Sequence, residues 1–288
     1  MNSVCRLGEI SFINALPFSL PNALAEETGI TKVILPPTGL NRAILIEELD
    51  VSAVSSAFYL RHKSQLTLLE DLSISAEKPV KSVLLFLPGG WDSLTPSTPL
   101  AVPGTSETSI ALMQYILFRR TGRMFKDNLV SFAAGEGDSY LQQGIPLLVI
   151  GDEALTLAQK YNQQVGIVDL AEAWQATTDK FFVFAVWVAR NDWAAEYPER
   201  LAEVNQLLLT QKYLFLRESL IQSAIIAKAH QQCPHLDEEL LRHYFTIALS
   251  YHLKDEHLRA LTKFEEILNW LDDDTADFTE RHRSLLSV

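Results

Sequence analysis

The chain has 288 residues, of which 48% are hydrophobic and 21% are charged, a composition typical of ordinary globular proteins. Its formal net charge of −12 argues against nucleic acid or an anionic membrane as a general partner. The two cysteines, Cys5 and Cys233, lack the spacing of a zinc site or of a disulfide framework, and we expect both to be reduced thiols.

The apolar residues of the chain indicate neither an export signal nor a membrane-spanning helix. The first residues, MNSVCRLGEISF, hold one basic residue and no apolar stretch of the kind found in export signals. The longest apolar runs, PLLVIG (146–151) and FFVFAVWVA (181–189), are far shorter than a membrane-spanning helix. We therefore expect a soluble cytoplasmic protein, and the sequence gives no indication of its oligomeric state.

Strand-like and helix-like segments alternate in the first part of the chain. The segments with strand character are 6–13, 32–36, 50–55, 66–74 and 80–87, and those with helical character are 17–26, 41–49 and 57–62. This alternation predicts parallel strands with helices on the faces of a sheet. The strand VKSVLLFL (80–87) is almost continuously apolar, which indicates burial on both of its faces.

A loop rich in Pro, Gly, Ser and Thr, PGGWDSLTPSTP (88–99), separates this series from a second one. The second series has predicted strands at 100–103, 128–133, 146–151, 165–170 and 181–188, and predicted helices near 106–119, 137–143 and 153–162. After Asn191 the apolar residues recur every three or four positions, which predicts helices over 196–231, 237–252 and 255–271. We expect the acidic stretch DDDTAD (272–277) to be a solvated end.

The predicted helical tail has no third sheet on which to pack, which favours two α/β lobes between which the chain crosses twice. We expect residues 1–87 and 188–288 to form the first lobe, with the tail packed on it, and residues 88–187 to form the second. Ligands of such sheets bind beyond the carboxyl ends of the strands, in the cleft between the lobes.

Two polar residues are the leading candidates for that cleft. Asn14 follows the first strand and precedes Pro17, so it is either a turn residue or an amide aimed at a ligand. Ser82 lies in the apolar strand 80–87, where its hydroxyl either bonds its own sheet or faces the cleft.

Further polar residues stand where a predicted strand gives way to a helix. They are Ser55, Ser56, Thr105, Ser106, Thr108, Ser109 and Asp152. The loop PGTSETS (103–109) offers hydroxyl groups and unpaired N–H groups at a helix start, which bind a carboxylate or phosphate without Arg or Lys, although ordinary capping explains the same residues. Asp152 is either a helix cap or a buried carboxylate that orients a partner or acts as a base.

The chain lacks a phosphate-binding loop, a G-x-G-x-x-G segment after a strand, a G-x-S-x-G segment and an H-E-x-x-H segment. His252 and Glu256 have helical spacing, but no third metal ligand accompanies them. The sequence therefore gives no support for Ser-His-Asp hydrolysis, nucleotide transfer or zinc chemistry.

Five segments together resemble one family. They are RLGEISFINALPF, KSVLLFL, GTSETSIALMQYIL, LLVIGDEAL and VDLAEAW followed by FVFAVW. In order and spacing they resemble MqnA, the chorismate dehydratase family of the futalosine route to menaquinone, and YFTIALSYHLKDEHLRALTKF (244–264) resembles its closing helices. This resemblance implies the fold of type II periplasmic binding proteins, dehydration of chorismate to 3-enolpyruvylbenzoate, and neither a metal nor an organic cofactor.

The resemblance also implies roles for individual residues. Through SFINALP, Asn14 matches the asparagine at the end of the family's first strand, and through KSVLLF, Ser82 matches its crossing-strand serine. These two are the implied catalytic residues. Thr108 and Ser109 match the family's Thr-Ser pair at the helix start, and Ser55–Ser56 match its serines after the third strand.

One segment departs from the family, and two other hypotheses stay open. TTDKFF (177–182) replaces the family's usual Thr-Gly-Leu-Pro-Phe-like turn, which bears on the geometry of that edge of the cleft. The naphthoate-forming sister enzyme of the pathway has the same fold, but a Ser-Pro-x-Pro-Asn-like loop where this chain has SFINALP. A non-catalytic small-anion binding protein of the same fold would keep the cleft without turnover.

Overall fold

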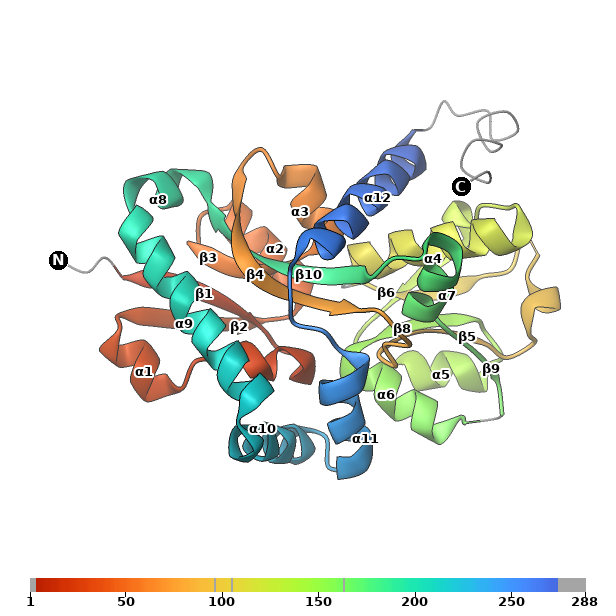
Figure 1. The fold of residues 1–288 in the computed structure, drawn as a ribbon. Coiled ribbons are helices and arrows are strands. Elements are labelled where there is room, and N and C mark those ends of the chain that lie inside the picture. Colours follow the sequence, from red (N-terminus) through yellow and green to blue (C-terminus); the bar gives the residue numbers. More distant parts are fainter. Residues whose placement is uncertain (1–3, 96, 105, 163, 274–288) are drawn as a thin grey trace.

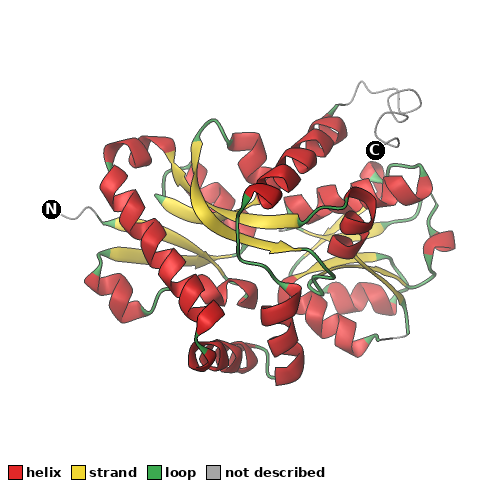
Figure 2. Ribbon diagram, viewed as in Figure 1, coloured by secondary structure: helices red, strands yellow, loops and turns green. Residues whose placement is uncertain are grey.

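Two five-stranded sheets, each with helices packed around it, make up the computed structural model (Figures 1 and 2). It describes residues 4–273 except 96, 105 and 163. The predicted α/β class is confirmed, and both sheets contain parallel and antiparallel pairs.

The first sheet consists of β1 (Cys5–Ile10), β2 (Ile30–Leu35), β3 (Val51–Ser55), β4 (Leu66–Ala76) and β10 (Phe182–Arg190). Its strand order is β2-β1-β3-β10-β4. β1 pairs in parallel with β2 and β3, whereas β10 is antiparallel to β3 and β4. The carboxyl ends of β1 and β3 therefore lie at the same edge of the sheet, and both lead into segments that line the cavity described below.

The second sheet consists of β5 (Val83–Leu87), β6 (Leu100–Pro103), β7 (Leu129–Phe132), β8 (Leu147–Ile150) and β9 (Gly166–Asp169). Its strand order is β7-β6-β8-β5-β9. β6 pairs in parallel with β7 and β8, and β5 is antiparallel to β8 and β9.

The two strands expected at the lobe boundaries belong to the opposite sheets from those predicted. β5 was placed in the first lobe, but it lies between β8 and β9 of the second sheet, and β10 lies in the first. The chain thus changes sheets at 77–82, ahead of the loop 88–99, and returns at 179–181. Both strands are apolar on both faces, a pattern that indicates a central strand without indicating which sheet contains it. Ser82, expected inside a strand, lies just before β5.

Short helices connect the strands of each sheet. Around the first sheet these are the 3-10 helix η1 (Ile13–Phe18), α1 (Asn22–Glu27), α2 (Pro37–Leu45) and α3 (Ser56–His62). Around the second they are η2 (Trp91–Ser93), α4 (Glu107–Thr121), η3 (Lys126–Asn128), α5 (Gly137–Gln142), α6 (Gly151–Lys160) and α7 (Leu170–Thr178). The sequence analysis did not predict α7, although Asp169 caps it by accepting the N–H groups of Ala171 and Glu172.

The tail consists of α8 (Asn191–Glu196), α9 (Pro198–Arg217), α10 (Ser219–Gln232), α11 (Glu238–His243), the π-helix η4 (Tyr244–Ala248) and α12 (Asp255–Asp272). α9 packs across η1 and β4 of the first lobe, and α10 also contacts η1 (Figure 1). α12 contacts both α3 and α4, so the tail touches both lobes.

Asp71 on β4 anchors the tail to the first sheet. Its carboxylate lies 2.8 Å from Lys212 Nζ and 2.8 Å from Lys254 Nζ, and it accepts hydrogen bonds from the Tyr213 hydroxyl and the Leu253 N–H. Lys212 is fully buried, so its charge depends on Asp71 for compensation. One carboxylate thereby joins β4, α9 and the segment that leads into α12.

Candidate active site

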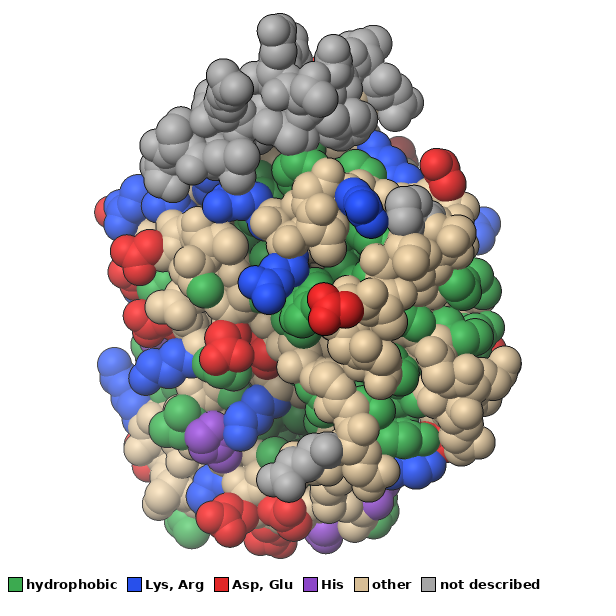
Figure 3. Space-filling model, turned by 90° about the vertical axis from the view of Figure 1, so that its right-hand side faces the viewer, with side chains coloured by type: hydrophobic (Ala, Val, Ile, Leu, Met, Phe, Trp, Pro, Cys, Tyr) green, Lys and Arg blue, Asp and Glu red, His purple; other side chains and the backbone are tan. Residues whose placement is uncertain are grey.

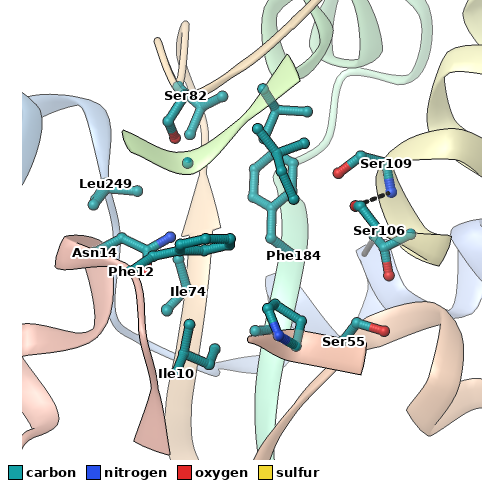
Figure 4. Close-up of a pocket in the computed structure, with 17 residues that line it drawn as sticks. Ile10, Phe12, Asn14, Ser55, Ile74, Ser82, Ser106, Ser109, Phe184 and Leu249 are labelled. Carbon is teal, nitrogen blue, oxygen red and sulfur yellow. Dashed lines mark hydrogen bonds between the residues drawn. The ribbon is translucent and has the colours of Figure 1, made fainter. Parts of the chain in front are cut away.

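A cavity lies between the two sheets (Figure 4). Most of its wall is apolar, and the polar side chains that line it are those of Asn14, Ser55, Ser82, Ser106, Thr108 and Ser109. Its described lining residues include no Lys, Arg, Asp or Glu. Six of the nine predicted site residues therefore line this one cavity.

Four helices begin at this cavity. Pro37 is the first residue of α2, Ser55 precedes α3, Ser106 precedes α4, and Gly151 is the first residue of α6. The first turn of a helix has N–H groups without an intrahelical partner and carries partial positive charge. This wall can therefore bind an anion without a cationic side chain.

Asn14 and Ser82 both line the cavity, and each follows or precedes a strand end. Asn14 lies in η1, after β1, and Ser82 lies at the first crossing between the sheets, just before β5. The Tyr244 hydroxyl donates a 2.8 Å hydrogen bond to Ser82 Oγ. Asn14 Oδ1 is buried, and no described residue provides it with a hydrogen-bond partner.

Tyr244 was not among the predicted site residues. The tyrosine is fully buried and begins the π-helix η4. Single-turn π-helices occur often at functional sites. The segment YFTIALSYHL showed only apolar residues at helical spacing, because a π-turn differs from an α-turn in its backbone hydrogen bonds and has no residue pattern of its own.

The opposite side of the cavity carries the hydroxyl groups at the start of α4 (Figure 4). Ser106 Oγ accepts the N–H of Ser109 and so caps the helix, while the Ser109 side chain points into the cavity. Ser55 also lines the cavity, and its Oγ accepts a 3.1 Å hydrogen bond from Asn41. The two alternatives for this loop, capping and ligand binding, are compatible, because capping uses the Ser106 hydroxyl and leaves Ser109 directed at the cavity.

Of two further predicted residues, Thr108 connects the lobes and Ser56 bonds within the first lobe. Thr108 Oγ1, on α4, accepts the N–H of Ala57 on α3 at 2.9 Å. The Ser56 hydroxyl donates to the Val183 carbonyl on β10 at 2.7 Å, and Ser56 does not line the cavity. Thr105, predicted to bind the ligand with them, lies outside the described residues.

Asp152 lies beside the cavity and does not line it. Its carboxylate oxygens are 3.3 and 3.4 Å from the N–H of Ile13, which connects α6 of the second lobe to η1 of the first. Burial raises the pKa of Asp152 to about 6, although the Ile13 N–H opposes that shift. The geometry thus gives Asp152 a contact with the backbone next to Asn14.

The rest of the described chain offers little for other chemistry. No three His, Cys, Asp or Glu residues in it are grouped so as to hold a metal ion, and Cys5 and Cys233 are buried and unpaired. None of its helices has the length and apolar character needed to cross a bilayer. Figure 3 shows charged side chains of both signs scattered over the face at the second lobe's end.

The sequence matches a family model described as menaquinone biosynthesis over residues 5–269. The chain belongs to this menaquinone-biosynthesis family. A curated relative, the chorismate dehydratase of Thermus thermophilus, is 30% identical over 256 residues, which cover 81% of this chain and 84% of the relative. The resemblance to chorismate dehydratases is confirmed.

Solved structures show the fold shared by this member of the menaquinone-biosynthesis family. Protein AF1704 from Archaeoglobus fulgidus has a TM-score of 0.66 at 16% identity, covering 93% of this chain and 97% of its own. The periplasmic aliphatic sulphonate binding protein SsuA from Escherichia coli has a TM-score of 0.65 at 13% identity, covering 94% and 88%. The predicted periplasmic-binding-protein-like fold is therefore confirmed.

The segment TTDKFF (177–182), which departs from the family's usual turn, lies at the second crossing between the sheets. It includes the end of α7 and the left-handed residue Asp179, with φ of 53°. None of its residues lines the cavity, where β10 contributes Phe184 and Ala185 instead. The departure in this family member thus lies away from the candidate site.

Proposed function

We propose that the protein is a chorismate dehydratase, a lyase that converts chorismate to 3-enolpyruvylbenzoate and water on the futalosine route to menaquinone. The observation that supports it most is a cavity with neutral hydrogen-bonding side chains and four helix N-termini but no charged lining residue, in a chain related to a chorismate dehydratase. A biosynthetic enzyme of this kind is expected in the cytoplasm.

The cavity suits the charge of the substrate. Chorismate carries two carboxylates, and the partial positive charge at the first turns of α4 and α6 favours them. The Ser109 hydroxyl adds a donor at the start of α4. Because the protein has a net charge of −12, such local donors have to outweigh an unfavourable overall field.

The reaction removes the ring hydrogen beside the enol ether and the neighbouring hydroxyl. That hydrogen is acidic through conjugation to the ring carboxylate, so negative charge builds on this carboxylate as the proton leaves, and aromatisation drives the loss of water. In the chorismate dehydratase family the proton is thought to go to the substrate's own enolpyruvyl carboxylate. A cavity without a charged side chain is consistent with such substrate-assisted catalysis.

Asn14 and Ser82 would stabilise and orient the reacting groups. Both are neutral, so neither adds negative charge beside a dianion, and each is held by a backbone that the packing of two sheets makes rigid. Preorganised donors directed at developing charge accelerate a reaction because they need no rearrangement in the transition state.

Incubating the purified protein with chorismate, and identifying the product by mass spectrometry and NMR, tests this proposal. We expect 3-enolpyruvylbenzoate from the parent protein and a large loss of product with Ser82→Ala. Binding of chorismate without any product would favour the non-catalytic binding protein. Unchanged chorismate with no binding by calorimetry would contradict both hypotheses.

A further inference from the structure

We propose that Tyr244 is a positioning residue whose hydroxyl sets the direction in which Ser82 presents its own hydroxyl proton to the cavity. The kinetic part of this inference rests on the proposed function. Its structural part rests on the two side chains alone.

The hydrogen bond between Tyr244 and Ser82 has a definite direction. The phenolic proton is donated to Ser82 Oγ at 2.8 Å. Ser82 is 2% exposed, and its backbone carbonyl is held at 2.7 Å by the N–H of Gly151. With the backbone held and Oγ acting as the acceptor, the hydroxyl's own proton must leave along another direction, and the cavity is the neighbouring space. The cavity thus receives a hydrogen-bond donor from Ser82 whose direction is set from outside the cavity.

A donor in this position suits an anionic or oxygenated ligand, because the Ser82 hydroxyl can bind a carboxylate or a departing oxygen. Burial raises the pKa of Tyr244, so its hydroxyl keeps its proton at any working pH. The direction of the hydrogen bond from Tyr244 to Ser82 is therefore constant.

The position of Tyr244 in the tail explains how the hydroxyl is held in place. The tyrosine is fully buried, and its ring packs edge-on against Phe245 with the ring centroids 5.6 Å apart. Because η4 belongs to the tail, it is the tail and not either sheet that places this hydroxyl beside Ser82, at the crossing between the lobes. Removal of the hydroxyl would leave the ring packing unchanged but would free the Ser82 hydroxyl to rotate.

The test compares Tyr244→Phe, Ser82→Ala and the double variant with the parent, using the rate of chorismate consumption. We expect Tyr244→Phe to lower kcat by about tenfold or more with little change in KM, a smaller loss than removal of the donor itself. The double variant should lose less than the product of the two single losses, because Tyr244 acts largely through Ser82. A parental kcat for Tyr244→Phe, or fully multiplicative losses, would overturn the proposal.

Tyr251→Phe is the matched control. Tyr251 lies in the same tail, is also fully buried, and donates its hydroxyl to the Phe245 carbonyl at 3.2 Å. We expect this variant to lower the melting temperature while leaving kcat at the parental value. If Tyr251→Phe lowers kcat as much as Tyr244→Phe does, the effect is a general loss of tail packing and the inference is wrong.

A parent protein that leaves chorismate unchanged contradicts the proposed function but not the hydrogen bond from Tyr244 to Ser82. The parent, Tyr244→Phe, Ser82→Ala and the double variant are then compared by urea unfolding. Non-additive changes in the free energy of unfolding for Tyr244→Phe and Ser82→Ala support the directed hydrogen bond, and additive changes overturn it.

Discussion

The carboxylate of Asp152 faces the backbone N–H of Ile13 at 3.3 and 3.4 Å, and this contact joins the second lobe to the first directly beside Asn14. The contact involves no side chain of the first lobe. It places a titratable carboxyl next to the cavity that the proposed dianionic substrate would occupy.

Asp152→Asn should change how stability depends on pH. Burial raises the pKa of Asp152 from 3.8 to about 6, so between those values the folded protein binds a proton that the unfolded chain does not. The contribution of Asp152 to the free energy of unfolding therefore falls as pH rises from about 4 to 6 and is constant above. We expect the variant, which keeps an acceptor for Ile13, to be more stable than the parent at pH 7 by roughly 2–3 kcal/mol. Urea unfolding of both proteins from pH 4 to 7.5 measures the difference, and parallel profiles would contradict this prediction.

Gly151→Ala should crowd the contact between the lobes. Gly151 has φ of 65°, and an added Cβ would lie 3.2 Å from the ring of Phe12, which belongs to the other lobe. We expect weaker chorismate binding and lower stability. Gly144→Ala is the control, because Gly144 has φ of 74° and nothing within 4 Å of an added Cβ. It should show the backbone strain alone, with binding by calorimetry unchanged. Equal effects of both substitutions on binding would mean that the contact with Phe12 is unimportant.

Asn14→Asp and Ser82→Ala should abolish most turnover while the protein stays folded. A carboxylate at position 14, which lines the cavity, repels a dianion. Ser82→Ala removes the donor itself. We expect turnover of chorismate to fall by roughly a hundredfold or more in each, with melting temperatures near the parental value. A purely structural role would instead lower the melting temperature and leave turnover per folded molecule unchanged.

Asp71→Asn should destabilise the protein without affecting the cavity. Burial alone would raise the pKa of Asp71, but hydrogen bonds from Lys212 and Lys254 hold it well below its usual range. This stabilisation is present above the unfolded pKa of about 3.8 and is lost as pH falls below that value. Removing the charge leaves Lys212 buried and uncompensated, so we expect a loss of about 3–5 kcal/mol.

Asp138→Asn serves as the control for Asp71→Asn. Asp138 forms a solvent-exposed ion pair with Lys160 at 2.6 Å, and such pairs contribute little to stability. Thermal unfolding compares the two variants, and chorismate turnover per folded molecule should stay parental in both. Equal melting temperatures for the two variants would show that the buried position of Lys212 has no special cost.

Local sequence patterns were sufficient where the determinants are local. The strands of the first sheet and the helix at 107–121 follow apolar periodicity and a serine cap, and the structure places them within a few residues of the predicted bounds. The predicted helical stretch over 196–231 consists of two helices, α9 and α10, because the chain turns at Glu218. This break does not interrupt the apolar spacing on which the prediction was based.

The sequence by itself determined the α/β class, the family and the two neutral residues Asn14 and Ser82 that line the cavity, because each depends on short segments whose residue types are visible in order. Only the tertiary structure decided that β5 belongs to the second sheet, that Asp152 faces Ile13 rather than the cavity, and that Tyr244 reaches Ser82 across 162 positions of the chain. These contacts join residues far apart in sequence, and a single chain's periodicity contains no information about which distant segments pack together.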